Sequence, residues 1–336
     1  MDRSIRLGVS SCLVGHNVRY DGGHKRNAYV ADTLAAFFEF VPVCPEVECG
    51  LGVPRQAMRL TGDPAAPRLM TIHADLDLTD RMRAYCARRV SELAGENLCG
   101  YIFKSKSPSS GMARVKVYPE KGPPSMTGVG LFARAFMDRF PLLPVEEEGR
   151  LNDARLRENF IERVFTLARY RDLLAGLGLD EQGRESADAG EGRPGRRART
   201  GQLTAFHAAH KYLLMSHSPK IAGEMGRLTA RAASLADEEL IPEYQRLLVS
   251  AMALQATPAK HVNVLQHILG YFKTQLTPDE KAEALDLFER YRAGQTPLVV
   301  PMTLVSHFVR KYDTAALKNQ WYLQPHPKEL MLRNHV

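Results

Sequence analysis

The sequence predicts an α/β domain followed by an all-α domain. Three observations carry this prediction. Strand-like and helix-like patterns alternate over the first half of the chain, only helical patterns follow residue 200, and a segment rich in glycine, proline and charge separates the two halves. Alternating strands and helices are typical of a mostly parallel sheet covered by helices.

The first half contains four strand-like and three helix-like segments. Short apolar runs predict strands at residues 5–9, 37–43, 101–104 and 142–145. Helices are expected at 79–93, 129–140 and 156–174. In the first of these helices, Met82, Cys86 and Val90 recur at helical spacing and form one apolar face. We therefore interpret Cys86 as a packing residue.

The second half contains helical patterns only. They predict helices at residues 203–215, 239–254, 259–272, 278–293, 300–312 and 314–321. The helix that starts at residue 278 has the clearest N-terminal signal. Thr277 can cap it, Pro278 suits the first helical position, and two acidic residues follow.

Residues 180–199 have the composition of a linker. They contain glycine, proline and dense mixed charge, but no large apolar side chain to bury. We therefore expect an α/β domain at 1–175, a flexible linker at 176–200 and an all-α domain at 201–336.

The composition narrows the protein class. The chain has 336 residues, of which 44% are hydrophobic and 25% charged, as in ordinary globular proteins. No apolar stretch reaches the ~18 residues of a membrane span. The first residues lack the pattern of a secretory signal, so a cytoplasmic protein with no membrane partner is expected. The net charge of +7 permits contact with nucleic acid or anionic ligands without requiring it.

Three cysteines follow the predicted strands: Cys12 after the first, and Cys44 and Cys49 after the second. The carboxyl ends of parallel strands meet at one edge, where open α/β sheets place their ligand sites. Thiolates gathered there repel each other unless a metal or cluster neutralises them, and the C-x4-C spacing also occurs among iron–sulfur ligands. A metal or cluster site is therefore favoured, with a reactive thiol and ordinary packing as alternatives.

Acidic and hydroxyl side chains accompany these cysteines. Glu46 can transfer protons beside a metal site, or it can cap a helix or form a salt bridge. Ser107, Ser109 and Ser110 follow the third strand and can hydrogen-bond a polar ring, or they can simply form a turn. Three basic residues can neutralise cluster or phosphate charge or stay solvated: Arg19, Arg55 and Lys104. Cys99 precedes the third strand and can pack, serve as a further ligand or act as a redox partner.

The predicted helix at 203–215 begins a histidine-rich segment. His207 and Lys211 share one face, and His210 and His217 share another. These side chains can contact phosphate or RNA bases, or they can be structural; a metal site is a further alternative, although no carboxylate lies at a matching offset.

The motifs at the three strand ends resemble those of the bacterial thiouracil desulfurase family. They read SSCL followed by RYDGGHKR, then VCPEVECGLGVPR, then FKSKSPSSGM, and the resemblance covers about residues 4–150. The segment FHAAHKYLLMSHSP resembles a second domain of unknown function. The whole chain is similar to the fused form, the thiouridine desulfidases that act on 4-thiouridine in tRNA.

The resemblance implies a 4Fe-4S cluster held by three cysteines, whose open iron binds the sulfur of a thiolated pyrimidine while water replaces that sulfur. Cys12 and Cys44 would be ligands, and Glu46 would be the catalytic acid/base, assisted by Ser107 or Ser109. Smaller family members have a cysteine where this chain has Ser110, so Cys49 is assigned as the third ligand, with Cys99 as its substitute.

The resemblance leaves the substrate and the role of the second domain to be tested. In the main reading the helical domain binds or positions tRNA. The alternatives are a desulfidase for free thiolated nucleobases or nucleosides, and a non-catalytic iron–sulfur sensor.

Overall fold

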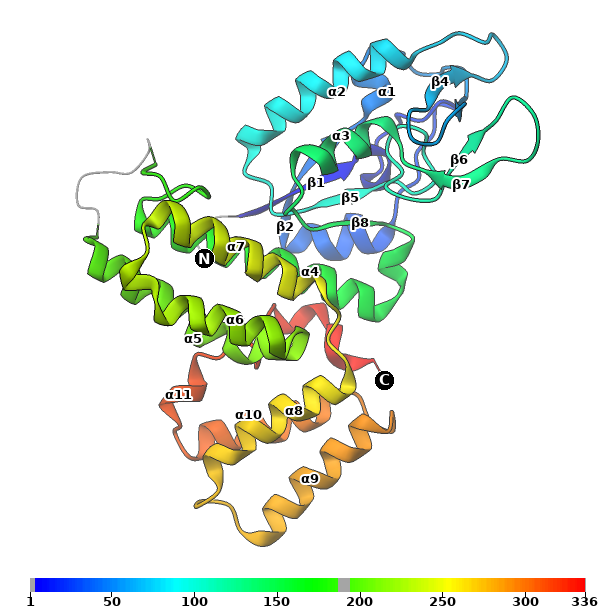
Figure 1. Ribbon diagram of the computed structural model, residues 1–336. Coiled ribbons are helices and arrows are strands. Elements are labelled where there is room, and N and C mark those ends of the chain that lie inside the picture. Colours follow the sequence, from blue (N-terminus) through cyan, green and yellow to red (C-terminus); the bar gives the residue numbers. More distant parts are fainter. Residues whose placement is uncertain (1–3, 187–193, 336) are drawn as a thin grey trace. The chain divides into compact units, whose positions relative to one another are not determined.

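The computed structural model describes residues 4–186 and 194–335. It divides into two compact units, Met1–Asp153 and Ala154–Val336 (Figure 1). The division therefore lies before the helix expected at 156–174, and not within 176–200. That helix contributes Tyr170, Leu174 and Leu177 to the helical core, which is why it belongs to the second unit. Part of the expected linker, residues 187–193, lies outside the described residues.

The main sheet of the N-terminal unit is entirely parallel. Its strand order is β2-β1-β5-β8, with bounds Phe38–Val43, Ile5–Ser10, Tyr101–Phe103 and Val145–Glu147. The predicted α/β class is confirmed. The fourth strand begins three residues later than expected, because residues 142–144 form the turn that leads into it.

Two helices pack on this sheet, α2 (Thr79–Leu93) and α3 (Leu131–Arg139). Phe132 and Phe136 of α3 contact the rings of Tyr101 and Phe103 on β5. All four rings are fully buried. These contacts fix the amino end of α3 close to the end of β5, where the serine motif begins.

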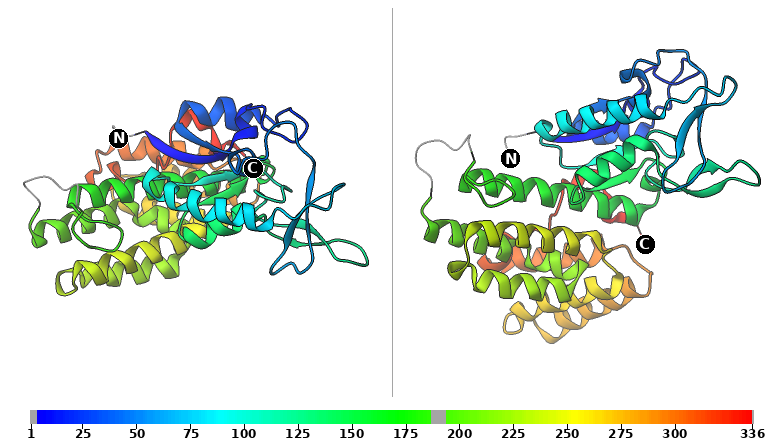
Figure 2. Two further views of the ribbon diagram at one scale, coloured as in Figure 1. Left: turned by 90° about the horizontal axis from the view of Figure 1, so that it is seen from above. Right: turned by 45° about the horizontal axis from the view of Figure 1, so that its top comes forward.

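A second sheet was not predicted from the sequence. Its order is β4-β3-β6-β7, with bounds Arg68–Thr71, Met58–Thr61, Val115–Tyr118 and Ser125–Gly128. It consists of two antiparallel hairpins joined through the parallel pair β3 and β6. Figures 1 and 2 show it at one end of the N-terminal unit.

The second unit is helical, as expected. Its helices are α4 Ala154–Leu177, α5 Arg196–His217, α6 Pro219–Ala230, α7 Asp237–Ala253, α8 Pro258–Leu269, α9 Pro278–Arg292, α10 Val299–Lys311 and α11 Ala315–Lys318. The predicted start of α9 is confirmed, because Thr277 and Glu280 form a reciprocal capping box. Helix α6 was not predicted, and α11 is shorter than expected.

Within the described parts of the chain, none of the helices combines the length and the apolar character needed to cross a membrane.

Candidate active site

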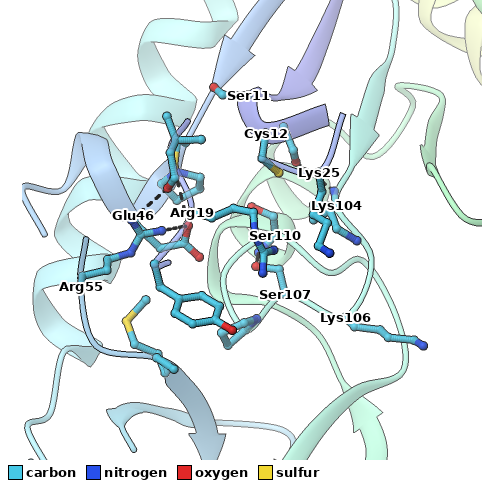
Figure 3. A pocket seen from close by; sticks show the side chains of 18 of the residues that line it. Ser11, Cys12, Arg19, Lys25, Glu46, Arg55, Lys104, Lys106, Ser107 and Ser110 are labelled. Atoms are coloured by element: carbon cyan, nitrogen blue, oxygen red, sulfur yellow. Dashed lines mark hydrogen bonds and ion pairs between the residues drawn. The ribbon is translucent and has the colours of Figure 1, made fainter. Parts of the chain in front are cut away.

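A cavity of about 400 Å³ lies at the carboxyl ends of β1, β2 and β5. The segment that follows each strand contributes to its wall, so the cavity lies at the edge of the sheet where the strand-end argument expects a ligand site. Figure 3 shows these side chains converging on the cavity. The sequence-predicted residues that line it are Cys12, Arg19, Cys44, Glu46, Arg55, Lys104, Ser107 and Ser110.

Cys12 and Cys44 bring two buried thiols to this cavity. Cys12 lies in the short turn Ser11–Val14 after β1, and Cys44 precedes the four-residue helix α1 (Pro45–Glu48). Burial raises the pKa of Cys12 to about 11 and, together with the charge of Glu46, that of Cys44 to about 12. Both thiols are therefore protonated at neutral pH, which argues against a free thiolate nucleophile.

Glu46 on α1 is held from two sides. Its Oε1 accepts a hydrogen bond from Ser109 Oγ at 2.5 Å, and its Oε2 accepts one from Arg55 Nη2 at 2.9 Å. The sulfur of Cys44 lies 3.6 Å from the same Oε2. The carboxylate is thus fixed beside a thiol and a hydroxyl, in reach of the cavity.

The serine loop is fixed by its own hydrogen bonds and by α3. Ser107 Oγ accepts from the backbone N–H groups of Ser109 and Ser110 at 3.3 and 3.1 Å. The amides of Phe132 and Ala133 in the first turn of α3 donate to the carbonyl of Ser109. These amides have no partner within a helix, so the loop satisfies them. Gly130 permits the contact, since a Cβ there would lie 2.5 Å from that carbonyl group.

The basic residues predicted for the site each have an acidic partner. Arg55 pairs with Glu46, Arg19 with Asp21 and Lys104 with Glu148. Arg55 also donates to the carbonyls of Val18 and Gly52, so it cross-links the loops that follow β1 and β2.

Two further lysines, Lys25 and Lys106, line the cavity and were missed. Neither has an ion pair within the described residues. The sequence signal that could have found them is their position in the motifs RYDGGHKR and FKSKSPSSGM, which follow two of the predicted strands.

Cys49 and Cys99 do not line the cavity. Cys49 follows the carboxyl end of α1, and its thiol donates to the carbonyl of Glu46 at 3.3 Å. The amide of Cys99 donates to the carbonyl of Arg6 near the start of β1, which places Cys99 at the amino ends of the strands. The structure therefore brings two of the three proposed cysteine ligands together, and Ser110 with them.

The histidine motif of the helical unit is mostly internal. His210 is buried and accepts from Arg169 Nε at 3.0 Å, while His217 is buried against Glu162 at 2.9 Å. Of the alternatives for these two histidines, the structural role is confirmed and direct contact with RNA is wrong, because both residues are fully buried. Lys211 alone of the four is exposed, and His207 is half-buried.

The cavity's donor set is suited to an iron–sulfur group. Two protonated thiols lie at the cavity, and binding a cation there would release their protons. Lys104 and Arg19 lie close enough to lower the pKa of Cys12, against the larger effect of burial, so they favour its thiolate. Cys12 and Cys44 thus provide two of the three thiolates that the resemblance implies. At the third ligand position this chain has Ser110 in place of the cysteine of the smaller family members.

Comparison with known proteins finds a match for each of the two parts of the chain. Residues 7–148 match the family model of 2-thiouracil desulfurase, and residues 211–327 match that of a protein of unknown function, DUF1722. The chain is 27% identical over 135 residues to the uncharacterized protein YbgA of Escherichia coli K12, spanning 40% of this chain and 80% of that one. It is also similar to the solved 4Fe-4S-dependent thiouracil desulfidase TudS, with 26% identity, a TM-score of 0.38, and coverage of 45% of this chain and 95% of that one.

Proposed function

We propose that the chain removes sulfur from 4-thiouracil-type bases, with 4-thiouridine in tRNA as its substrate. The match of residues 7–148 to the family model of 2-thiouracil desulfurase supports this proposal. Uridine and sulfide are the products, and water supplies the new oxygen. The observation that carries the proposal is the convergence of Cys12, Cys44, Glu46 and Ser110 on one cavity.

Cys12 and Cys44 are proposed as two ligands of a 4Fe-4S cluster. When bound, such a cluster supplies an open iron that acts as a Lewis acid toward the thiocarbonyl sulfur. The two thiols enter this role by losing their protons, since thiolates are the ligands of such clusters. The third ligand is Cys49 in the assignment from sequence, and Ser110 is its competitor.

Glu46 is proposed to move the protons of the reaction. Its two oxygens already receive hydrogen bonds from Ser109 and Arg55, so the carboxylate is oriented before substrate binds. It can accept a proton from the attacking water and return it to the ring or to the departing sulfide. Ser107 and Ser109 hold this geometry, because Ser107 fixes the loop and Ser109 contacts the carboxylate.

Transfer RNA as the substrate requires that the base leave its stack before it reaches the cavity. Lys25 and Lys106 at the cavity are available to phosphate groups. We propose that the helical unit contributes to tRNA binding, although not through His210 or His217.

The test is anaerobic desulfuration of 4-thiouridine, both as the nucleoside and within tRNA. Cluster-reconstituted protein, iron-free protein and a reconstituted Glu46→Gln variant are compared by the loss of thiocarbonyl absorbance. The proposal expects activity only with the cluster, and a loss of ~10²–10⁴-fold in the variant, as for removal of a general acid/base.

Each alternative makes a different prediction in the same assay. Turnover of the nucleoside or free base, with tRNA neither bound nor converted, favours the small-substrate enzyme. Tight tRNA binding that weakens steeply with salt favours the RNA substrate, because phosphate contacts release counterions. A protein that holds iron and sulfide yet converts no thiolated compound is not a desulfidase, and the sensor then remains.

A further inference from the structure

The cavity contains two cysteines where three are needed. Its other oxygen and nitrogen groups are mostly engaged: Glu46 with Arg55 and Ser109, and Lys104 with Glu148. Ser110 also lines the cavity, and its hydroxyl makes only a long contact of 3.4 Å with Ser109 Oγ. Figure 3 shows Ser110 and Cys12 among the side chains that line this cavity.

Cys49 is held away from this position by its own backbone. Arg81 on α2 donates to the carbonyls of Cys49 and Gly50, each at 2.7 Å. Gly50 has a φ of +86°, and a Cβ there would lie 2.6 Å from the Arg81 guanidinium. The loop that carries Cys49 is therefore tied to α2, and its thiol donates back to α1 and not into the cavity.

Ser110 is held as firmly, but on the cavity side. It is 4% exposed, and its amide donates to Ser107 Oγ at 3.1 Å. Its hydroxyl contacts Ser109 Oγ, which in turn donates to Glu46 Oε1. A chain of two hydroxyls thus runs from the wall of the cavity to a carboxylate.

We propose that the Ser110 oxygen, and not the Cys49 sulfur, is the third protein ligand of the cluster. The inference rests on the proposed function, since it assumes that a cluster is bound here. On binding, the O–H bond of Ser110 breaks, an O–Fe bond forms, and the proton passes to water or along Ser109 to Glu46. No electron is transferred. An oxygen donor is harder than a thiolate, so this cluster is held less tightly than one with three cysteines.

The experiment measures iron and acid-labile sulfide per chain after anaerobic reconstitution of the full-length protein. Ser110→Ala and Ser110→Cys are compared with Cys49→Ala, and Cys12→Ala serves as a variant that must lose the cluster. Far-UV circular dichroism shows whether each variant is folded. Ser110→Cys is nearly isosteric with the parent, so it tests the position without removing a donor.

The proposal expects Ser110→Ala to lose most of its iron and sulfide, as Cys12→Ala does, while Cys49→Ala keeps the parental amounts. Ser110→Cys should lose iron to a chelator more slowly than the parent. The electron paramagnetic resonance spectrum of the reduced cluster should change in Ser110→Cys and not in Cys49→Ala.

The opposite pattern, with iron lost in Cys49→Ala and kept in Ser110→Ala, overturns the inference and assigns Cys49. Full retention in both variants also overturns it, because neither side chain is then needed. Full retention in Cys12→Ala shows that iron is bound elsewhere, and that result contradicts the proposed function itself.

Discussion

The two units differ in the polar side chains that they bring together. Beside the cavity of the N-terminal unit, the buried ones are thiols and hydroxyls, and the half-buried ion pair of Glu46 with Arg55 lies with them. In the helical unit several buried groups carry charge. They include Glu158, Glu162, Arg169 and Arg333.

The charged network of the helical unit is internally compensated. Arg333 donates to Glu158 at 3.1 Å, to Glu162 at 2.9 Å and to the carbonyl of Tyr322 at 2.6 Å. Burial, and then the neighbouring Glu162, raise the pKa of Glu158. Against the effect of burial, His217 and Arg333 lower the pKa of Glu162. Arg333 thus forms ion pairs with both carboxyl groups and offsets their charge.

The comparison of the two units separates buried polar groups that stabilise a core from those that could bind a ligand. Possible ligand atoms of Glu158, Glu162 and His326 lie within 4.8 Å of one another, a spacing that could hold a metal ion. Arg333 already occupies the place of the cation, so the cluster stabilises the helical core. The cavity of the other unit instead brings two thiols together, and thiols that lose their protons are metal ligands.

The largest effect is expected from Arg333→Met. It leaves two buried carboxylates without their cation, so the free energy of unfolding of the helical unit should fall by ~3–5 kcal/mol. Trp321 is the chain's one tryptophan, and its fluorescence therefore follows this unit. The matched control is Arg292→Met, whose exposed ion pair should contribute under ~1 kcal/mol. Equal stability of the two variants would contradict the compensated network.

A change confined to the other unit is Gly130→Ala. The new Cβ meets the Ser109 carbonyl group at 2.5 Å, so the serine loop must shift. Overpacking of this kind costs ~1–3 kcal/mol, and cluster content should fall with it. The fluorescence transition of Trp321 should not move. The control is Gly149→Ala, where the nearest atom would be 3.9 Å away.

The buried histidines of the helical unit should contribute stability that is lost in acid. Burial lowers the pKa of His261 to about 3, and that of His210 well below 6.5. Between these values and 6.5 the unfolded chain binds protons at these histidines that the folded chain does not, so their contribution to stability falls as the pH falls. For His261 this loss at pH 5 is ~2 kcal/mol. Urea unfolding of the parent and of His261→Asn at pH 7, 6 and 5 tests this, since the stability of the parent relative to the variant should fall as the pH falls.

The smallest effect is expected from Asp77→Asn in the N-terminal unit. Hydrogen bonds from Thr79, and then from Arg68, lower the pKa of Asp77 to about 2. The contribution of Asp77 to the free energy of unfolding is present above pH 3.8 and is lost as the pH falls toward 2. This pH range lies below the one in which the histidines act. Because the carboxylate is largely exposed, the change at pH 7 should stay below ~1 kcal/mol. Thermal unfolding at pH 7 and pH 3 gives the comparison.

The periodicity of apolar residues predicted where helices and strands form better than it predicted which other elements they pack against. The helix expected at 156–174 exists as α4, but its spacing says nothing about which core its apolar face joins. The second sheet was missed because its strands have four residues each and lie among glycine, proline and charged residues. Strands so short depend on pairing with segments far along the chain, and no local pattern marks them.

The site was predictable as far as the strand-end rule reaches. It placed Cys12, Cys44, Glu46 and Ser107 correctly at one cavity. It did not place Cys49, because Cys44 and Cys49 flank a four-residue helix whose two ends face different neighbours. The helical periodicity also could not predict that His210 and His217 are buried. A polar residue on a helix is expected at the surface unless its buried partner is known, and these partners are Arg169 and Glu162.

The hydrogen bonds that join Glu148 to Ser105, just before the serine loop, have a consequence for how the protein is made. Glu148 accepts hydrogen bonds from the backbone and the hydroxyl of Ser105, each at 2.7 Å, and it follows the last strand of the sheet. On the ribosome, Cys12 and Cys44 are therefore synthesised 136 and 104 residues before Glu148, which anchors the start of the third strand-end segment. During that interval the two thiols are open to oxidants and to stray metal ions.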